Sequence, residues 1–318
     1  MRQWVRTRRA IGLVCLGALG LAGGVRADWP IQAQMELAGE TVGEALVPRP
    51  GGGAIAAWSE GRVNGTSFVQ TLVVRWVDRA FSPIREILVD QGAPGPPFRG
   101  VACIAIARLA DDGVAVAWLE TKPGQGRVKY RVFGPDGEPR TDARYAQGPF
   151  RVQDEPCPTV RSGPRGFVLA WSVFVRTFAP DGSSVSPLIN FAPGSHIQPV
   201  PALSSAGESG FALAYFENDQ IHGPVRLMVR RYDWDAEPLG VPVRVIDSGS
   251  QVGGVQLEES GRGLQLAWTR ILSGGMSIQA QRLNRDLQLQ RLVRVVRVDS
   301  PERAFLTDLA VDRSGRAI

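Results

Sequence analysis

The sequence predicts an all-β protein, a β-propeller built from four-stranded blades. A six-residue pattern, Gly-x-x-x-Ala-aromatic, recurs five times with constant internal spacing. Each copy is accompanied by further short apolar or alternating segments, and no segment after the first 27 residues shows the 3.6-residue period of an amphipathic helix. Four short strands in each repeat of roughly fifty residues are typical of propeller blades.

The repeated pattern defines the second strand of each blade. Its glycine stands five residues before the aromatic residue, and its alanine stands one residue before it. One large ring in every repeat suits the packing of one sheet on the next, so we expect these rings to fill the core between blades. The copies begin at Gly53, Gly113, Gly166, Gly210 and Gly263 and end at Trp58, Trp118, Trp171, Tyr215 and Trp268.

A sixth copy begins at Gly315 and stops at Ile318, before its aromatic residue. The sequence therefore predicts about six blades, the last one truncated, in a single propeller domain that spans residues 28–318. The simplest interpretation is that the natural protein continues beyond Ile318. Residues 31–37 have the length of an outer strand that would close the ring by pairing the two ends of the chain.

The other strands of each unit follow in a fixed order. An apolar segment precedes the glycine, as at residues 101–107, and an alternating segment follows the aromatic residue, as at residues 69–77. Asp136-Gly137 and Asp181-Gly182 then predict tight turns, because glycine readily adopts positive φ. The third unit is abbreviated after its tryptophan, so we expect its second hairpin to be distorted or nearly without a loop.

An arginine recurs near the end of the third strand. It caps the same layer by stacking or by pairing with the turn aspartate, or it lines the channel as an anion-binding ring. The end of a third strand usually lies far from the axis, which favours capping. The residues are Arg75, Arg131, Arg176, Arg231 and Arg282.

Two cysteines remain once the leader is excluded. Cys103 and Cys157 precede their anchor glycines by ten and nine residues, which predicts that both lie in the first strands of neighbouring blades. In an exported protein a disulfide there would join blades two and three, and two buried thiols are the alternative.

The first 27 residues predict a secretory signal peptide. A basic segment is followed by an apolar run over residues 10–25, which is shorter than the roughly 20 residues that span a bilayer. Cleavage is expected between Ala27 and Asp28, and the mature protein is expected in the periplasm or outside the cell, with no integral membrane segment. Arg8-Arg9 resembles a twin-arginine signal, and both export routes stay open.

The charge balance gives no case for nucleic acid as a partner. The chain of 318 residues carries 36 basic and 31 acidic side chains, and five of the arginines lie in the leader, which has no acidic residue. The remainder is therefore neutral and offers no basic surface for nucleic acid or an anionic membrane.

The sequence predicts no catalytic, cofactor-binding or metal-binding residue. Only His196 and His222 are present, without the spacing of a zinc site, and no Gly-x-Ser-x-Gly elbow occurs. The acidic pairs Asp111-Asp112 and Glu258-Glu259 precede repeat glycines and suggest solvated turn residues.

The segment from Gly166 to Trp171, followed by an arginine strand and Asp181-Gly182, resembles the tandem repeats of uncharacterised exported bacterial β-propeller proteins. The resemblance covers about residues 42–318 and implies the fold alone, since propellers include both enzymes and binding platforms. The Ser-x-Asp-x-Gly-x-Thr-Trp box of sialidase-like propellers and the docking repeat of quinone-dependent dehydrogenases are both missing.

We therefore expect an exported, non-catalytic propeller that serves as a binding or scaffolding module for a protein or glycan ligand. A glycan-acting enzyme, sialidase-like or otherwise glycoside-cleaving, is the alternative. The proline-rich segment 92–98 is a candidate contact loop because binding residues often lie on loops of a rigid scaffold; a rigid connector is its other interpretation.

Overall fold

A computed structural model describes most of the chain between residues 40 and 298. The predicted leader, residues 31–37, segment 92–98, His222 and the copy at Gly315 lie outside the described residues. The described residues are 40–64, 67–91, 100–122, 125–146, 157–193, 196–197, 201–204, 207–218, 225–248, 252–260, 263–272 and 275–298.

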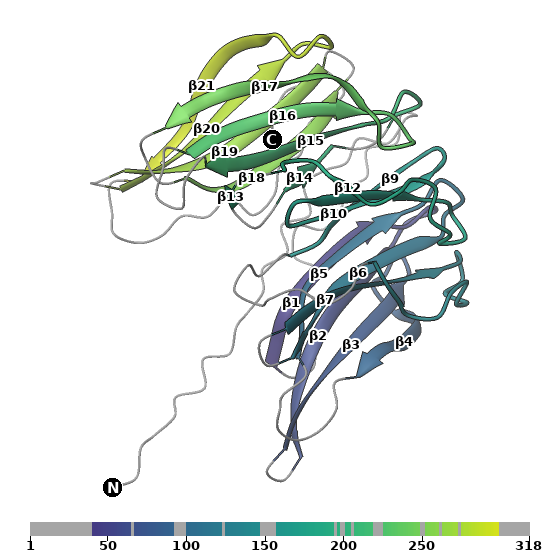
Figure 1. Ribbon diagram of the computed structural model, residues 1–318. Helices are drawn as coiled ribbons and strands as arrows, with labels where there is room; N and C mark the ends of the chain where they lie inside the picture. Colours follow the sequence, from purple (N-terminus) through teal and green to yellow (C-terminus); the bar gives the residue numbers. More distant parts are fainter. Residues whose placement is uncertain are drawn as a thin grey trace, which may run out of the picture.

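The described elements are strands, and they form five antiparallel sheets in chain order, as Figure 1 shows. The prediction of an all-β propeller is confirmed. Blade 1 contains β1 (Glu40–Pro48), β2 (Ala54–Asn64), β3 (Ser67–Val77) and β4 (Pro83–Gln91); blade 2 contains β5 (Gly100–Arg108), β6 (Val114–Lys122), β7 (Gln125–Phe133) and β8 (Arg144–Tyr145); blade 3 contains β9 (Thr159–Gly163), β10 (Gly166–Trp171), β11 (Phe174–Phe178) and β12 (Ile189–Asn190); blade 4 contains β13 (His196–Ile197), β14 (Ala202–Leu203), β15 (Phe211–Asn218), β16 (Val225–Tyr232) and β17 (Pro238–Ser248); blade 5 contains β18 (Val252–Ser260), β19 (Gly263–Leu272), β20 (Gly275–Leu283) and β21 (Leu289–Val298).

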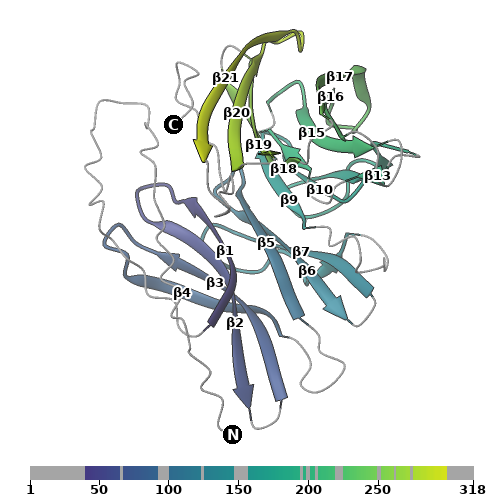
Figure 2. The ribbon, with the colours of Figure 1, turned by 90° about the vertical axis from the view of Figure 1, so that its left-hand side faces the viewer.

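The blades follow one another through their first strands. β1 lies beside β5, β5 beside β9, β9 beside β14 and β14 beside β18 (Figures 1 and 2). Antiparallel order places the first hairpin and the third turn of every blade at one end, which we call the turn end. The second hairpins and the links between blades lie at the opposite end, which we call the connection end.

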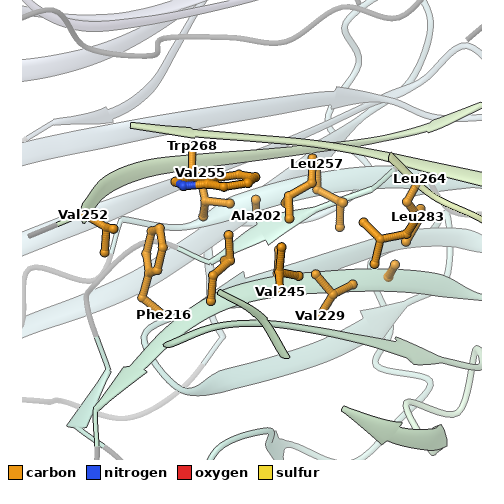
Figure 3. Packing of buried hydrophobic residues seen from close by; sticks show 14 of the residues in the cluster. Ala202, Phe216, Val229, Val245, Val252, Val255, Leu257, Leu264, Trp268 and Leu283 are labelled. Carbon is orange, nitrogen blue, oxygen red and sulfur yellow. The ribbon is translucent and has the colours of Figure 1, made fainter. Parts of the chain in front are cut away.

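The repeated aromatic side chains of blades 2 to 5 lie between blades, as predicted, whereas among the described residues Trp58 packs only with residues of its own blade 1. All five are at most 2% exposed. Trp118 of blade 2 packs in one cluster with Ile55 and Val74 of blade 1. Figure 3 shows the same arrangement at the junction of blades 4 and 5, where Trp268 of blade 5 lies near Phe216 of blade 4. The main core is therefore a series of junctions between sheets, each filled by one ring of the repeat.

The repeated glycine is explained by one close approach. A Cβ atom on Gly166 would lie 2.0 Å from the carbonyl oxygen of Phe178, and one on Gly210 would lie 1.9 Å from that of Tyr232. Both glycines also have positive φ, at +139° and +123°. A side chain at this position would collide with backbone that is fixed in the third strand. The anchors Gly53, Gly113 and Gly263 make the corresponding approach to the carbonyls of Val77, Phe133 and Leu283.

The turn between the third and fourth strands has the same hydrogen bonds in all five blades. Its first residue bonds through N–H to the carbonyl of its fifth residue, and its fourth residue has positive φ. Gly137 and Gly182 occupy that fourth position, so the predicted Asp-Gly turns are confirmed. The other blades accept a side chain there because their first residue, Asp78, Asp233 or Asn284, receives two backbone N–H groups at Oδ1.

Each of the first three blades also donates a hydrogen bond to the next blade's turn. These bonds link neighbouring blades at the turn end and use carbonyl groups that the turn itself leaves available. They run from Arg85 Nη1 to Asp136 O (2.7 Å), from Tyr130 Oη to Gly182 O (3.0 Å) and from Thr177 Oγ1 to Trp234 O (2.7 Å).

Blade 3 is short, as its sequence predicts. Trp171 pairs with Phe174 across a hairpin with only two residues between them, and Ser172 adopts a positive φ of 47°. The fourth strand, β12, has two residues. The second hairpin is therefore present but nearly without a loop.

The predicted disulfide is present. Cys103 and Cys157 are bonded, with their Cα atoms 5.0 Å apart and a sequence separation of 54. Cys103 lies in β5, whereas Cys157 lies just before β9 rather than within it. The bond joins blades 2 and 3 at the connection end, where it closes a long loop of the unfolded chain.

Gly210→Ala tests the close approach. We expect it to lower the free energy of unfolding by at least about 2 kcal/mol, because the added methyl group meets a fixed carbonyl at positive φ. Gly207→Ala is the matched control, since no atom lies within 4 Å of its added Cβ. Urea unfolding followed by circular dichroism measures both variants. Equal stabilities would contradict this explanation of the repeat.

Candidate functional site

The repeated arginines connect the third strand to the fourth. Arg75, Arg131 and Arg176 each stand opposite the residue three positions after the anchor glycine. In blade 4 that place belongs to Arg230, not Arg231, and in blade 5 Gln281 takes it, not Arg282. The predicted positions at Arg231 and Arg282 are therefore wrong by one residue.

The contacts of this position show why it repeats. In blades 2 to 5 the side chain donates a hydrogen bond to a backbone carbonyl nine or ten residues further on, and Arg131, Arg176 and Arg230 also stack on the aromatic residue two positions later. Two of the predicted roles, pairing with the turn aspartate and forming an anion-binding ring, are therefore wrong for these three arginines. The bonds are Arg131 Nε to Thr141 O (3.0 Å), Arg176 Nε to Ser186 O (3.1 Å), Arg230 Nε to Gly240 O (2.9 Å) and Gln281 Nε2 to Gln290 O (2.9 Å).

Blade 1 departs from this pattern. Arg75 pairs with the carboxylate of Glu86 on β4, and its guanidinium carbon lies 4.8 Å from the ring centroid of Trp58. The residue two positions later is Val77, so no ring is available there. The side chain still connects the third strand to the fourth.

Asp111 and Asp112 lie in a turn and are partly exposed, as predicted, whereas Glu258 and Glu259 lie in β18, so the prediction of turn residues is wrong for that pair. Glu258 Oε1 lies 2.8 Å from Arg161 Nη2, which connects β18 of blade 5 to β9 of blade 3. Glu259 pairs with Arg231 of blade 4 at 3.4 Å. Asp111 pairs with Arg140 at 2.5 Å, and Asp112 pairs with Arg108 at 2.8 Å. These carboxylates hold parts of the scaffold together.

The histidines form no common site in the described part of the chain. His196 pairs through its backbone with Asn218 at the end of β15, and His222 lies outside the described residues. Among the residues that the structure describes, no group of three His, Cys, Asp or Glu side chains could hold a metal ion. No helix in that same part of the chain is long and apolar enough to cross a membrane.

A group of interacting ionisable side chains lies between blades 1 and 2 at the connection end. Strand register places its members on one face of blade 2, because Trp118 and Tyr145 both stand opposite Lys129, and Glu120 stands opposite Arg127. That face packs against blade 1, whose β4 contributes an aspartate near its end. We call Asp90, Trp118, Glu120, Arg127, Lys129 and Tyr145 the junction cluster.

Lys129 is the centre of the junction cluster. Its Nζ atom lies 3.0 Å from Asp90 Oδ2 and 2.9 Å from Glu120 Oε1. Trp118 Nε1 donates to the same Asp90 oxygen at 3.0 Å, and the Tyr145 hydroxyl donates to Glu120 Oε2 at 3.4 Å. The Asp90, Glu120 and Lys129 side chains are between 9% and 18% exposed, so this ionic network is largely withdrawn from solvent.

The network keeps Lys129 charged. Burial by itself lowers the pKa of the ammonium group, but hydrogen bonds and charge attraction from Glu120 and Asp90 together raise that pKa above its ordinary value of 10.5. A permanently protonated amine has no lone pair for nucleophilic attack or proton abstraction. The cluster can therefore orient and bind polar groups, but Lys129 does not act as a base at neutral pH.

The outer part of the junction cluster reaches the surface. Tyr145 is 46% exposed. The Arg127 guanidinium carbon lies 5.0 Å from the centroid of the Tyr145 ring, and Lys129 Nζ lies 5.2 Å from the same centroid. Arg127 Nε is buried and has no hydrogen-bond partner among the described residues. Tyr145 is thus partly exposed to solvent, with two cationic side chains beside its ring.

The described residues of the junction between blades 4 and 5 lack this combination. In blade 4, Ile246 occupies the position that Asp90 occupies in blade 1, as the shared register with Leu227 and Leu72 shows. The buried Trp268 Nε1 consequently has no hydrogen-bond partner in the described chain, whereas Trp118 has one. The sequence analysis missed the cluster, although Lys129 is one of only two lysines in a chain rich in arginine.

Comparisons with known proteins add only distant matches. No protein family model matches the chain, and no curated protein matches its sequence. The solved structures that match include K. marxianus Hsv2, which is 11% identical over 78% of this chain and 95% of that chain, with a TM-score of 0.29. At such values the similarity carries no inference about function.

Two other matches are equally distant. A structure of the eukaryotic initiation factor is 11% identical over 89% of this chain and 70% of that chain, with a TM-score of 0.33. Prolyl oligopeptidase B from Galerina marginata is 8% identical, with a TM-score of 0.37; the match covers 87% of this chain and 46% of the peptidase chain. This chain therefore matches less than half of the peptidase's length.

Lys129→Met tests the ionic network. We expect it to lower the free energy of unfolding by about 3 kcal/mol, because it leaves two buried carboxylates without their cation. Arg79→Met removes an exposed cation and is the control. Chemical unfolding at pH 7 measures both changes. A Lys129→Met protein as stable as the control would show that the ammonium group holds nothing together.

Proposed function

We propose that the protein is an exported, non-catalytic β-propeller that acts as a binding or scaffolding module. One observation carries the proposal, namely the contrast between the two ends of the described structure. The turn end repeats the same hydrogen-bonded turn in all five described blades. Hydrogen bonds from blades 1, 2 and 3 to the turn of the next blade connect neighbouring blades there. Repetition of this kind serves the scaffold.

The connection end varies from blade to blade. The strands that end and begin there are separated in the sequence by residues 92–99, 146–158, 191–195 and 249–251, which differ in length and composition. Binding residues concentrate on variable connections that a rigid scaffold positions. The junction cluster lies at this same end, which supports a ligand site there, for either a protein or a glycan.

The chemistry of the junction cluster favours binding over catalysis. Asp90 and Glu120 both lie within 3.0 Å of Lys129 Nζ, so the bonded oxygens are no more than about 6 Å apart, which is close enough for a glycosidase pair. The space between them, however, holds the ammonium group, whereas hydrolysis requires the glycosidic oxygen there. This is the one observation that bears on the alternative of a glycan-acting enzyme.

The proposal includes export to the periplasm or the exterior and a relationship to exported bacterial propeller repeat proteins. It rests on the basic and apolar segments of residues 1–27 and on the repeat pattern. An exported protein also meets the oxidising conditions in which a disulfide such as Cys103–Cys157 persists.

Export predicts a defined mature N-terminus. When the chain is produced in a bacterial host and the cells are fractionated, we expect protein outside the cytoplasm whose intact mass begins at Asp28, because small residues precede that site. Ala27→Arg is the control and should block cleavage. Recovery of the protein only in the cytoplasm with residues 1–27 attached would contradict export.

The non-catalytic character predicts that sugars remain intact. After prolonged incubation of the mature protein with sialyllactose or chitohexaose, chromatography should show no free sialic acid and no shorter oligomers beyond a buffer control. Release of product that Glu120→Gln abolishes would instead establish a glycan-cleaving enzyme at the junction cluster.

A further inference from the structure

The junction cluster contains an exposed ring whose position is fixed on several sides. Tyr145 lies on β8, which pairs with β7, so its backbone is part of the sheet. Its hydroxyl is bonded to Glu120, and two cations lie against its ring. A ring already held in place loses little conformational entropy when a ligand stacks on it.

The surroundings of the ring define which ligands fit. Lys129 and Arg127 contribute two positive charges, and Asp90 and Glu120 contribute two negative charges, so the cluster is neutral overall. A phosphate or carboxylate ligand would meet the carboxylates, and a cationic peptide would meet Arg127. A neutral ligand with an apolar face and a polar edge satisfies both kinds of group.

A pyranose ring has these properties. Its axial C–H groups form an apolar face that can lie on the tyrosine ring, and its hydroxyl groups both donate and accept hydrogen bonds. Around Tyr145, Arg127 offers donors, and the Tyr145 hydroxyl, which donates its proton to Glu120, offers an acceptor; hydrogen bonds to charged groups are the stronger ones. A few fixed polar groups around an apolar surface are what orient a small ligand.

We propose that the junction cluster is a glycan-binding site in which one pyranose ring of a neutral oligosaccharide stacks on Tyr145, while Arg127 and the Tyr145 hydroxyl bind its hydroxyl groups. Lys129 and Asp90 position Glu120 and hold the two blades together beneath the sugar. The proposal rests on the function proposed above and names the ligand class of that same site.

Calorimetric titration of the mature protein with cellohexaose, chitohexaose and maltohexaose tests the site. We expect at least one of these neutral sugars to bind, and Tyr145→Ala to weaken that binding by about tenfold or more, because it removes the stacking surface. Tyr145→Phe keeps the ring and should stay within about threefold of the unmodified protein. Val241→Ala, at a side chain that is 78% exposed on β17, is the control and should bind like the unmodified protein.

The outcomes separate this site from the broader function. Binding that survives Tyr145→Ala overturns the site but leaves a glycan-binding module. Absence of binding to all three sugars overturns the neutral-glycan proposal, while the export experiment still decides whether the protein acts outside the cytoplasm. Melting curves of each variant verify that the protein is folded at the temperature of the titration, so that any loss of affinity is not a loss of folding.

Discussion

The close approach of each repeat glycine to the last carbonyl of the third strand is the constraint on which the rest of the blade depends. It requires a residue without a side chain, and it fixes the register of the second strand against the third. From that register follow the inward direction of the aromatic ring and the place of the arginine that binds the fourth strand. The repeated sequence pattern thus follows from one backbone contact that occurs five times in the described structure.

The sequence predicted what is periodic and local. The second strands, the aromatic core, the Asp-Gly turns and the disulfide all follow from residue types at fixed spacing. The arginine position did not, because Arg230 and Arg231 are adjacent and only strand pairing shows which of them stands opposite Leu213. In the same way, the ion pair between Arg161 and Glu258 joins blades 3 and 5 and has no local pattern.

The junction cluster could not be predicted from the sequence for a related reason. Its six residues come from four strands of two blades, and its chemistry arises from Lys129 meeting Asp90 across a blade boundary. Isolated carboxylates in alternating strands look like surface residues until the neighbouring sheet is placed against them. Residues that depart from the repeat, such as Asp90 where blade 4 has Ile246, therefore give the cluster its ion pairs and hydrogen bonds.

Scaffold and site use the same strands in different ways. Residues that recur in every blade make the turn end uniform, whereas residues that differ between blades gather where the strands reach the connection end. Blade 3, with its short second hairpin, shows that the second strand persists even where the outer strands are reduced.

Hydrogen exchange of the free protein measures the central constraint most directly. The account predicts that the backbone amides of β2, β6, β10, β15 and β19 are the slowest to exchange in their own blades, including the short blade 3, because these strands are buried and held in register on both sides. A second strand whose amides exchange as fast as those of β8 or β12 would contradict it.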